Sequence, residues 1–342
     1  MALLNQSCIM HYEKNGDISR FILKDGVLYI TCWSKKSGIK RNGVFAESIE
    51  DIKACSDGQG HLYLFCMNMS GDLEIYAFGS EKNSRSRIIT GDSDILLRDF
   101  RPYISGKNCE LIVSHSKKEN RNERMLTKYT ISTESLITGG CDIDYEEKNL
   151  MEYETFGPVD EMAAVKAENE ENTVISVIEK NGDANSIILL RSNRFGYVEG
   201  LIKISMNNDI FWHDIIAAEN EIIAAYTVRD GGLFTIKFIT YNTKMHTLSN
   251  ERTVRKRMPC SHPVLVNFMG KIRLCWYENG AVYSCVINED GICEEPVKWK
   301  NSVGKKILRA EFILDDEEEK NRLKLYCRKV FITYPESTVT GF

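Results

Sequence analysis

The chain has 342 residues, of which 43% are hydrophobic and 27% are charged, and its formal net charge at pH 7 is −5. This acidic balance argues against a nucleic-acid-binding surface, which needs a concentrated basic face to neutralise phosphates. No stretch approaches the roughly 20 consecutive apolar residues of a transmembrane helix, so we expect no membrane insertion.

The amino terminus and the cysteines predict a cytoplasmic protein, or a component of a particle that assembles in the cytoplasm. The chain begins with neither the basic segment nor the sustained apolar run of a secretory signal peptide. Its 11 cysteines include no Cys-x-x-Cys pair, and most lie within apolar runs. There a free thiol behaves as a small hydrophobe, as expected in a reducing compartment.

A short β-type run recurs along the whole chain. Its clearest copies are Leu28–Trp33 (LYITCW) and Leu62–Met67 (LYLFCM). Five weaker copies follow at Leu111–His115, Val174–Ile178, Ile222–Tyr226, Ile272–Trp276 and Leu323–Cys327. The copies begin 34, 49, 63, 48, 50 and 51 residues apart, and four of these spacings are close to the length of one four-stranded propeller blade. The spacing of 34 indicates a truncated first blade.

Similar strands flank each copy. The predicted preceding strands, in chain order, are Ile18–Leu23, Ile49–Cys55, Leu97–Ile104, Val159–Val165, Trp212–Ala218, His262–Phe268 and Leu308–Leu314. Third strands are clearest at Leu73–Phe78, Met125–Ile131, Ile187–Arg191, Leu233–Tyr241, Ala281–Ile287 and Val330–Tyr334. The fourth strands are weaker, at Arg87–Thr90, Ser135–Thr138, Val198–Ile204, Thr247–Thr253 and Glu295–Trp299. Asn-Gly and Asp-Gly turns between the second and third strands supply the positive φ of tight hairpins.

From about Ser7 to Tyr334 the pattern resembles the β-propeller superfamily, without the repeated signatures of its WD40 or Kelch families. We predict an all-β, single-domain propeller of seven blades with four antiparallel strands each. The approximate blades are 13–46 (truncated), 47–92, 93–145, 155–206, 207–256, 257–300 and 301–342. The strand at residues 8–12 is expected to close the last blade, so that the N- and C-terminal segments pair and leave no free edge. Six or eight blades, or a pair of β-sandwiches, are the alternatives.

The first strand of each blade would line a central channel. One position near its start holds, from blade to blade, Ser19, Asp51, Asp99, Asp160, Asp214, His262 and Arg309. Asp51, Asp99, Asp160, Asp214, His262 and Arg309 are the candidates for binding a cation or a polar ligand at the channel mouth. A structural role for the aspartates is the favoured interpretation, because aspartates also accept hydrogen bonds from nearby backbone amides. Nothing in the sequence assigns a cofactor or a metal, since the histidines lack zinc-site spacing.

Three tryptophans, Trp33, Trp212 and Trp276, fit either sugar-stacking platforms or packing between blades. The function that we predict is non-enzymatic: a binding or scaffold protein that presents propeller loops to a protein partner. One alternative is a carbohydrate- or receptor-binding component of a phage tail or similar particle. Another is a glycan-processing hydrolase with an acidic channel, which would need two suitably spaced carboxylates.

Overall fold

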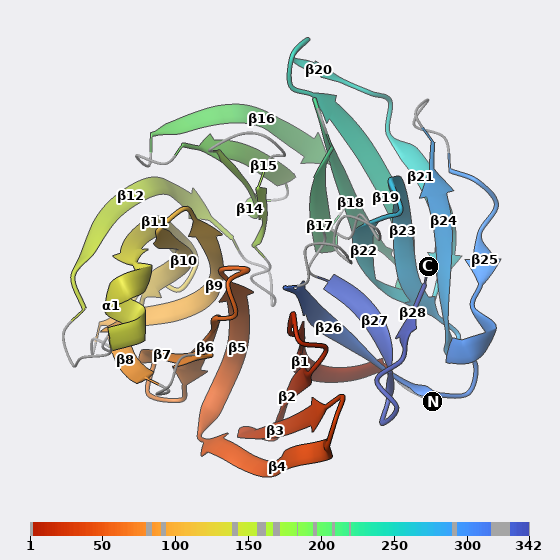
Figure 1. Cartoon of the computed structure of the whole chain (residues 1–342). Helices are drawn as coiled ribbons and strands as arrows, with labels where there is room; N and C mark the ends of the chain where they lie inside the picture. Colours follow the sequence, from red (N-terminus) through yellow and green to blue (C-terminus); the bar gives the residue numbers. More distant parts are fainter. Residues whose placement is uncertain are drawn as a thin grey trace.

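The protein is a β-propeller. The computed structural model describes residues 3–79, 84–89, 94–138, 143–155, 162–166, 172–182, 184–193, 197–206, 209–218, 220–288, 293–315 and 329–341. The strands of this part of the chain form six hydrogen-bonded sheets, which stand around a common centre (Figure 1). The predicted all-β architecture is therefore confirmed, while the hydrogen bonding groups the strands into six sheets and not seven.

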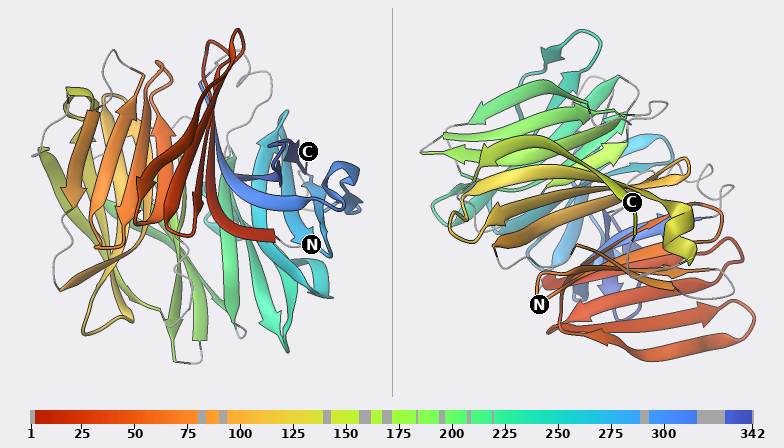
Figure 2. Two further views of the ribbon diagram at one scale, coloured as in Figure 1. Left: turned by 90° about the horizontal axis from the view of Figure 1, so that it is seen from below. Right: turned by 90° about the vertical axis from the view of Figure 1, so that its left-hand side faces the viewer.

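The largest sheet joins the two ends of the chain. Its strands, in spatial order, are β28 (Val339–Thr340), β27 (Lys329–Tyr334), β26 (Lys306–Leu314), β1 (Leu3–Tyr12), β2 (Ile18–Lys24), β3 (Val27–Ser34) and β4 (Gly38–Glu47). β1 pairs antiparallel with β2 and parallel with β26. The side views show this N-terminal strand, in dark red, running beside the blue C-terminal strands (Figure 2). We call strands β1–β4 of this sheet the first unit; the sequence indicated a truncated first blade at residues 13–46.

The other five sheets follow one another along the chain as antiparallel meanders, of which the fourth ends in two strands that both pair with its third strand. The first holds β5 (Ile49–Ser56), β6 (Leu62–Asn68), β7 (Leu73–Phe78) and β8 (Ser84–Ile89). The second holds β9 (Ile95–Ser105), β10 (Asn108–Lys117), β11 (Glu123–Ser132) and β12 (Tyr145–Glu154). The third holds β13 (Ala163–Lys166), β14 (Thr173–Asn181), β15 (Ala184–Ser192) and β16 (Val198–Met206). The fourth holds β17 (Ile210–Ala218), β18 (Glu221–Asp230), β19 (Leu233–Asn242), β20 (Thr247–Leu248) and β21 (Arg252–Met258). The fifth holds β22 (Cys260–Phe268), β23 (Lys271–Glu278), β24 (Ala281–Ile287) and β25 (Val297–Lys298), followed by a 3₁₀ turn at Lys300–Ser302.

One predicted strand is wrong. Ser135–Thr138 lies in a short helix, α1 (Thr133–Thr138), whose Leu136 is buried against the core. The fourth strand of the β9–β12 sheet is β12, so this sheet extends beyond the predicted blade boundary at residue 145. β12 is the outer strand, with half of its ten residues exposed and only Tyr153 buried, so it lacks the alternating apolar pattern of a half-buried strand. Leu323–Cys327 lies outside the described residues, and β26 pairs directly with β27.

The recurrent apolar run is a strand buried on both faces. In β6 every residue from Leu62 to Met67 is buried. Tyr63 and Phe65 pack with residues of the β9–β12 sheet, whereas Leu62 and Leu64 pack with residues of β2 and β3. Strands covered on both sides carry continuous apolar runs. The repeat visible in the sequence is therefore the strand that packs between neighbouring sheets.

The innermost strands place polar side chains at the centre. β1, β5 and β9 contact one another in turn, as do β13, β17 and β22, and β22 also contacts β27 (Figure 1).

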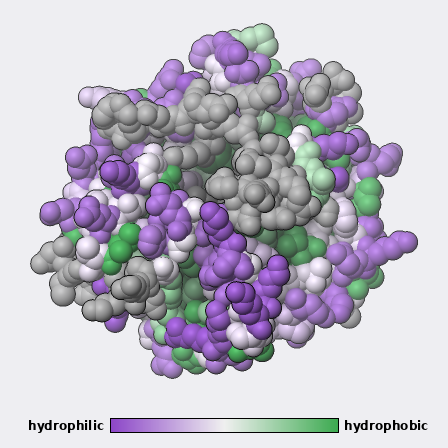
Figure 3. All heavy atoms as spheres, in the orientation of Figure 1, coloured by the Kyte–Doolittle hydropathy of each residue, from purple (hydrophilic) through white to green (hydrophobic). Residues whose placement is uncertain are grey.

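On the face turned to the viewer in Figure 3, hydrophilic residues predominate around the rim. None of the helices in the described part of the chain has the length and apolar character needed to cross a membrane.

Candidate functional site

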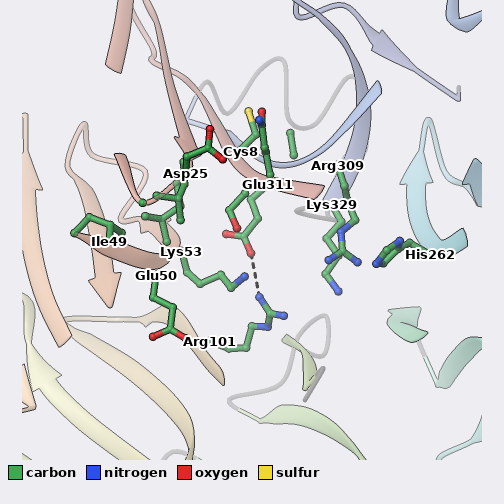
Figure 4. Close-up of a pocket in the computed structure, with 16 residues that line it drawn as sticks. Cys8, Asp25, Ile49, Glu50, Lys53, Arg101, His262, Arg309, Glu311 and Lys329 are labelled. Carbon is green, nitrogen blue, oxygen red and sulfur yellow. Dashed lines mark hydrogen bonds and ion pairs between the residues drawn. The ribbon is translucent and has the colours of Figure 1, made fainter. Parts of the chain in front are cut away.

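A cavity of about 390 Å³ lies between the innermost strands (Figure 4). β1, β5, β9, β22, β26 and β27 all contribute to its wall. Its lining carries four cationic side chains and one imidazole: Lys53, Arg101, Arg309, Lys329 and His262. Three carboxylates also line it: Asp25, Glu50 and Glu311. The wall therefore combines both charges, with cationic groups in the majority.

Strand alternation explains how the charged groups reach the centre. β5 carries Asp51 and Lys53 two residues apart, and the residue between them, Ile52, is buried in the core. Side chains two residues apart on a strand point to the same face. β9 repeats the arrangement with Asp99 and Arg101, on either side of a buried phenylalanine. β26 shows it a third time, as Arg309, Ala310 and Glu311.

Ion pairs connect these side chains within strands and across the centre. Lys53 Nζ lies 3.2 Å from Asp51 Oδ2, and Arg101 lies 3.4 Å from Asp99 Oδ2. Arg101 also reaches Glu311 Oε1 of β26 at 3.2 Å, a pair shown dashed in Figure 4. The guanidinium therefore bridges two inner strands that are distant in the sequence.

A further ion pair joins β27 to β17. Lys329 Nζ, from β27, lies 3.1 Å from Asp214 Oδ1 of β17. The lysine side chain is 13% exposed and the aspartate 6%, so both groups are largely withdrawn from bulk water. Because Lys329 lines the cavity, the pair ties the cavity wall to the fourth meander.

Two of the aspartates also hold neighbouring sheets together. Asp99 Oδ2 accepts a hydrogen bond from the backbone N–H of Met162, next to β13, at 2.9 Å. Asp214 Oδ2 accepts one from the backbone N–H of Leu265 on β22, also at 2.9 Å. In each case the aspartate binds an amide of the next sheet along the chain, which is the structural alternative expected from the sequence.

A β-bulge brings the N-terminal strand into the site. In the parallel ladder between β1 and β26 the register shifts between Leu4 and Cys8, where three residues face one. Bulges of this kind redirect side chains. Here Gln6 and Ser7 line the cavity, and Ser7 Oγ donates a hydrogen bond to Asp51 Oδ1 at 2.9 Å.

The pKa values of Asp51 and Asp99, on neighbouring inner strands, are shifted in opposite directions. Burial alone would raise the pKa of Asp51, but the nearby charges of Lys53 and Arg101 and the Ser7 hydroxyl outweigh burial and lower this pKa. For Asp99 burial dominates and raises the pKa, although Arg101 opposes it. Burial would lower the pKa of Arg101, but Asp99 and Glu311 raise it, so the guanidinium stays charged.

The structure gathers most of the predicted site residues around one cavity. His262 and Arg309 line it, while Asp51, Asp99 and Asp214 are partners of lining cations. Ser19, at the aligned position of the first repeat, lies on β2 and so is not on an innermost strand, and Asp160 lies outside the described residues. In the described part of the chain, no group of three or more His, Cys, Asp or Glu side chains could hold a metal ion.

His262 reaches the cavity through an irregular backbone. Its φ is +26°, an uncommon value for a residue with a side chain, and the ladder between β22 and β23 shifts register between Ser261 and Val264. The imidazole packs on Trp212, with ring centroids 4.3 Å apart. Trp212 is thus part of the support for a cavity residue.

Sequence reasoning missed Lys53, Arg101, Glu311 and Lys329. For the first three a signal was present, because each lies two residues from an oppositely charged neighbour on an inner strand: Asp-Ile-Lys, Asp-Phe-Arg and Arg-Ala-Glu. Such spacing places both charges on one face of a strand. Lys329 has no such local signal, since its partner Asp214 is 115 positions away.

A second cavity, of about 330 Å³, lies between strands β1–β4 and the β5–β8 sheet. It is lined by a half-buried tryptophan, Trp33, and by polar side chains that include Glu13, Asp17 and Lys40. The Arg20 guanidinium lies 4.9 Å from the Trp33 ring centroid. Trp276 is different: it is fully buried and stacks on a tyrosine, so its role is packing.

Solved structures with the same fold have diverse functions. The BP39L lectin from Burkholderia pseudomallei has a TM-score of 0.57 and 10% identity, with 84% of this chain and 82% of the lectin covered. A prolyl endopeptidase has a TM-score of 0.52 and 10% identity, over 88% of this chain and 44% of the enzyme. A quinonprotein alcohol dehydrogenase-like protein from Bacteroides thetaiotaomicron has a TM-score of 0.51 and 13% identity, over 87% and 67% respectively. No family model matches the sequence, and no curated protein matches it. At these identities the likeness shows the propeller fold alone.

Proposed function

We propose that the protein is a non-enzymatic binding module whose central cavity receives a small polar ligand carrying a carboxylate group. The observation that carries the proposal is the convergence of Lys53, Arg101, Arg309, Lys329 and His262 on one cavity. Its volume, about 390 Å³, lies within the range of about 300–1,000 Å³ that is typical of small-molecule sites.

The ion pairs in the wall prepare the cations for such a ligand. An ammonium has three N–H donors and a guanidinium five, so one cation can hold a protein carboxylate and a ligand at once. Asp51 and Asp99 hold Lys53 and Arg101 in place, and Asp214 does the same for Lys329. Groups fixed before binding lose less conformational entropy when a ligand arrives. A carboxylate in the cavity would receive charge-assisted hydrogen bonds, which are stronger than neutral ones.

The same contacts support a non-enzymatic role. A glycan hydrolase needs one carboxyl group that donates a proton and a second that acts as base or nucleophile, both facing the substrate. Asp99 and Asp214 are instead bonded to a cation and to a backbone amide of the next sheet, and Asp51 to Lys53 and Ser7. These bonds favour a structural role over a catalytic role for the three aspartates.

A thermal-shift screen tests the proposal. The probes are small carboxylates, namely acidic monosaccharides, dicarboxylic acids and amino acids, each paired with its uncharged alcohol or amide. Ligands that bind only the folded state raise the melting temperature. We expect at least one acid to raise it while its uncharged partner does not. If no acid does so, or if the uncharged partners act equally, the proposal is wrong.

Glycan binding at the second cavity is the other candidate. Trp33 offers an aromatic surface beside Asp17, Glu13 and Lys40, and such a mixture of apolar body and hydrogen-bonding groups suits a sugar. The shared fold with a lectin is consistent with this role but does not locate a site. A Trp33→Ala variant that binds a glycan array as well as the wild type would exclude it. A protein partner, a place in a larger particle and a cytoplasmic location stay predictions from the sequence.

We also infer that the propeller has seven blades in a closed ring. The seven-stranded sheet divides naturally where the parallel pairing of β1 with β26 replaces the antiparallel pairing found everywhere else among the described strands. We infer that β1–β4 and β26–β28 are two separate blades. Together with the five meanders they would surround the cavity.

A further inference from the structure

Two cysteines of the fifth meander lie in direct contact. Cys285 is on β24, and Cys293 lies in the segment that leads to β25. Their Sγ atoms are 2.9 Å apart. Cys293 forms an isolated antiparallel bridge with Ile287, and the next backbone N–H, of Glu294, bonds to Val286 O at 2.9 Å. The backbone therefore holds the two sulfur atoms together.

The two thiols differ in environment. Cys285 is 2% exposed within the core between two sheets, whereas Cys293 is half-buried at its edge. The hydrogen bond between the two thiols, together with burial, raises the pKa of Cys285, while the same bond lowers the pKa of Cys293. The proton is thus retained on Cys285, and Cys293 is the better nucleophile, because thiolates and not thiols attack disulfides.

A second cysteine pair provides an internal comparison. Cys55 and Cys109 belong to neighbouring sheets, with their Sγ atoms 4.0 Å apart. Both are fully buried, so an oxidant in solution does not reach them. Their contact is one of core packing, whereas the contact between Cys285 and Cys293 includes a residue that is only half-buried.

We propose that Cys285 and Cys293 are a reversible disulfide site, oxidised by a small disulfide compound such as oxidised glutathione. The Cys293 thiolate attacks one glutathione sulfur, forms a mixed disulfide and releases one glutathione thiolate, which takes up a proton. Cys285 then loses its proton to solvent and attacks Cys293 Sγ, and the second glutathione leaves and is protonated. Two protein thiols lose two electrons, and one glutathione disulfide is reduced to two thiols.

The bond would act at the outer edge of the propeller. It would fix the segment before β25 (Val297–Lys298) to β24, next to the loop between them. Because a cross-link restricts the unfolded chain, the oxidised protein should melt at a higher temperature than the reduced protein. This site is independent of the ligand proposed for the central cavity.

Peptide mapping of the full-length protein tests the proposal. The protein is equilibrated with oxidised glutathione, its remaining thiols are alkylated, and it is digested with a glutamate-specific protease. Glu289 lies between the two cysteines in the sequence, so cleavage leaves two peptides that only the disulfide joins. We expect the joined pair after oxidation and its complete loss after dithiothreitol.

Matched variants identify the bond. Cys293→Ser should abolish both the joined pair and the rise in melting temperature. Cys32→Ser removes another half-buried thiol, whose Sγ accepts a hydrogen bond from Ser19 Oγ at 3.4 Å, and should change neither. The proposal is overturned if the two peptides are recovered separately alkylated. A stable glutathione adduct on Cys293, or earlier oxidation of Cys55 and Cys109, would also contradict it.

Discussion

Arg101→Met tests how the centre of the propeller is held together. Arg101 is 10% exposed and bridges Asp99 and Glu311, which are 6% and 15% exposed, and its Nε donates to Met162 O at 3.0 Å. Methionine keeps much of the apolar stem but leaves two largely buried carboxylates without their cation. Removing one partner of a buried ion pair costs about 3–5 kcal/mol. We expect a loss of this size in the free energy of unfolding at pH 7.

Urea denaturation followed by tryptophan fluorescence measures the effect. The matched control is Arg121→Met in the exposed turn between β10 and β11, which should change the free energy of unfolding by less than about 0.5 kcal/mol. Adding Glu311→Gln to Arg101→Met removes one of the unpaired charges and should restore part of the loss. The reasoning is refuted if Arg101→Met costs no more than Arg121→Met, or if Glu311→Gln makes the variant less stable still.

Two further predictions concern pH and a close backbone contact. The pKa of Asp99 is higher in the folded protein than in the unfolded chain, so the wild type should lose stability as pH rises from about 4 through the folded-state pKa. The pKa of Asp51 is lower in the folded protein, so the wild type should also lose stability as pH falls below about 4. Asp99→Asn should remove the loss of stability at rising pH, and Asp51→Asn should remove the loss at falling pH. The urea midpoint of each variant is measured against pH, and profiles identical to that of the wild type would contradict the prediction. Gly79→Ala should cost more than about 1 kcal/mol in the same assay, because φ is +108° and a Cβ would lie 1.9 Å from Gly60 O. Gly43→Ala, where a Cβ meets nothing within 4 Å, is its control, and equal costs at the two positions would refute the contact.

The fold was predictable where burial leaves a pattern in the sequence. Leu62–Met67 is covered on both faces, and the resulting apolar run made the repeat visible. β12 has only one buried residue and carries no such pattern, so the sequence does not reveal it and predicts a strand at Ser135–Thr138 instead. Exposed outer strands are specified by pairing with their neighbour, which a single sequence does not show.

The candidate site was predictable in position but not in its contacts. Alignment of the repeats places Asp51, Asp99 and Asp214 at one repeat position, and the structure pairs each of them with a cation that lines the cavity. Their cationic partners depend on which strands face one another, and the Asp214–Lys329 pair joins residues 115 positions apart. Local spacing could identify only the pairs within one strand.

The most direct test of the central claim is calorimetric titration of the carboxylate that stabilises the protein most in the screen. The wild type, Arg309→Gln and Arg121→Gln are compared, since Arg309 lines the central cavity and Arg121 does not. We predict that Arg309→Gln weakens binding at least tenfold, whereas Arg121→Gln binds like the wild type. Unchanged affinity in Arg309→Gln would place the ligand elsewhere and contradict the account.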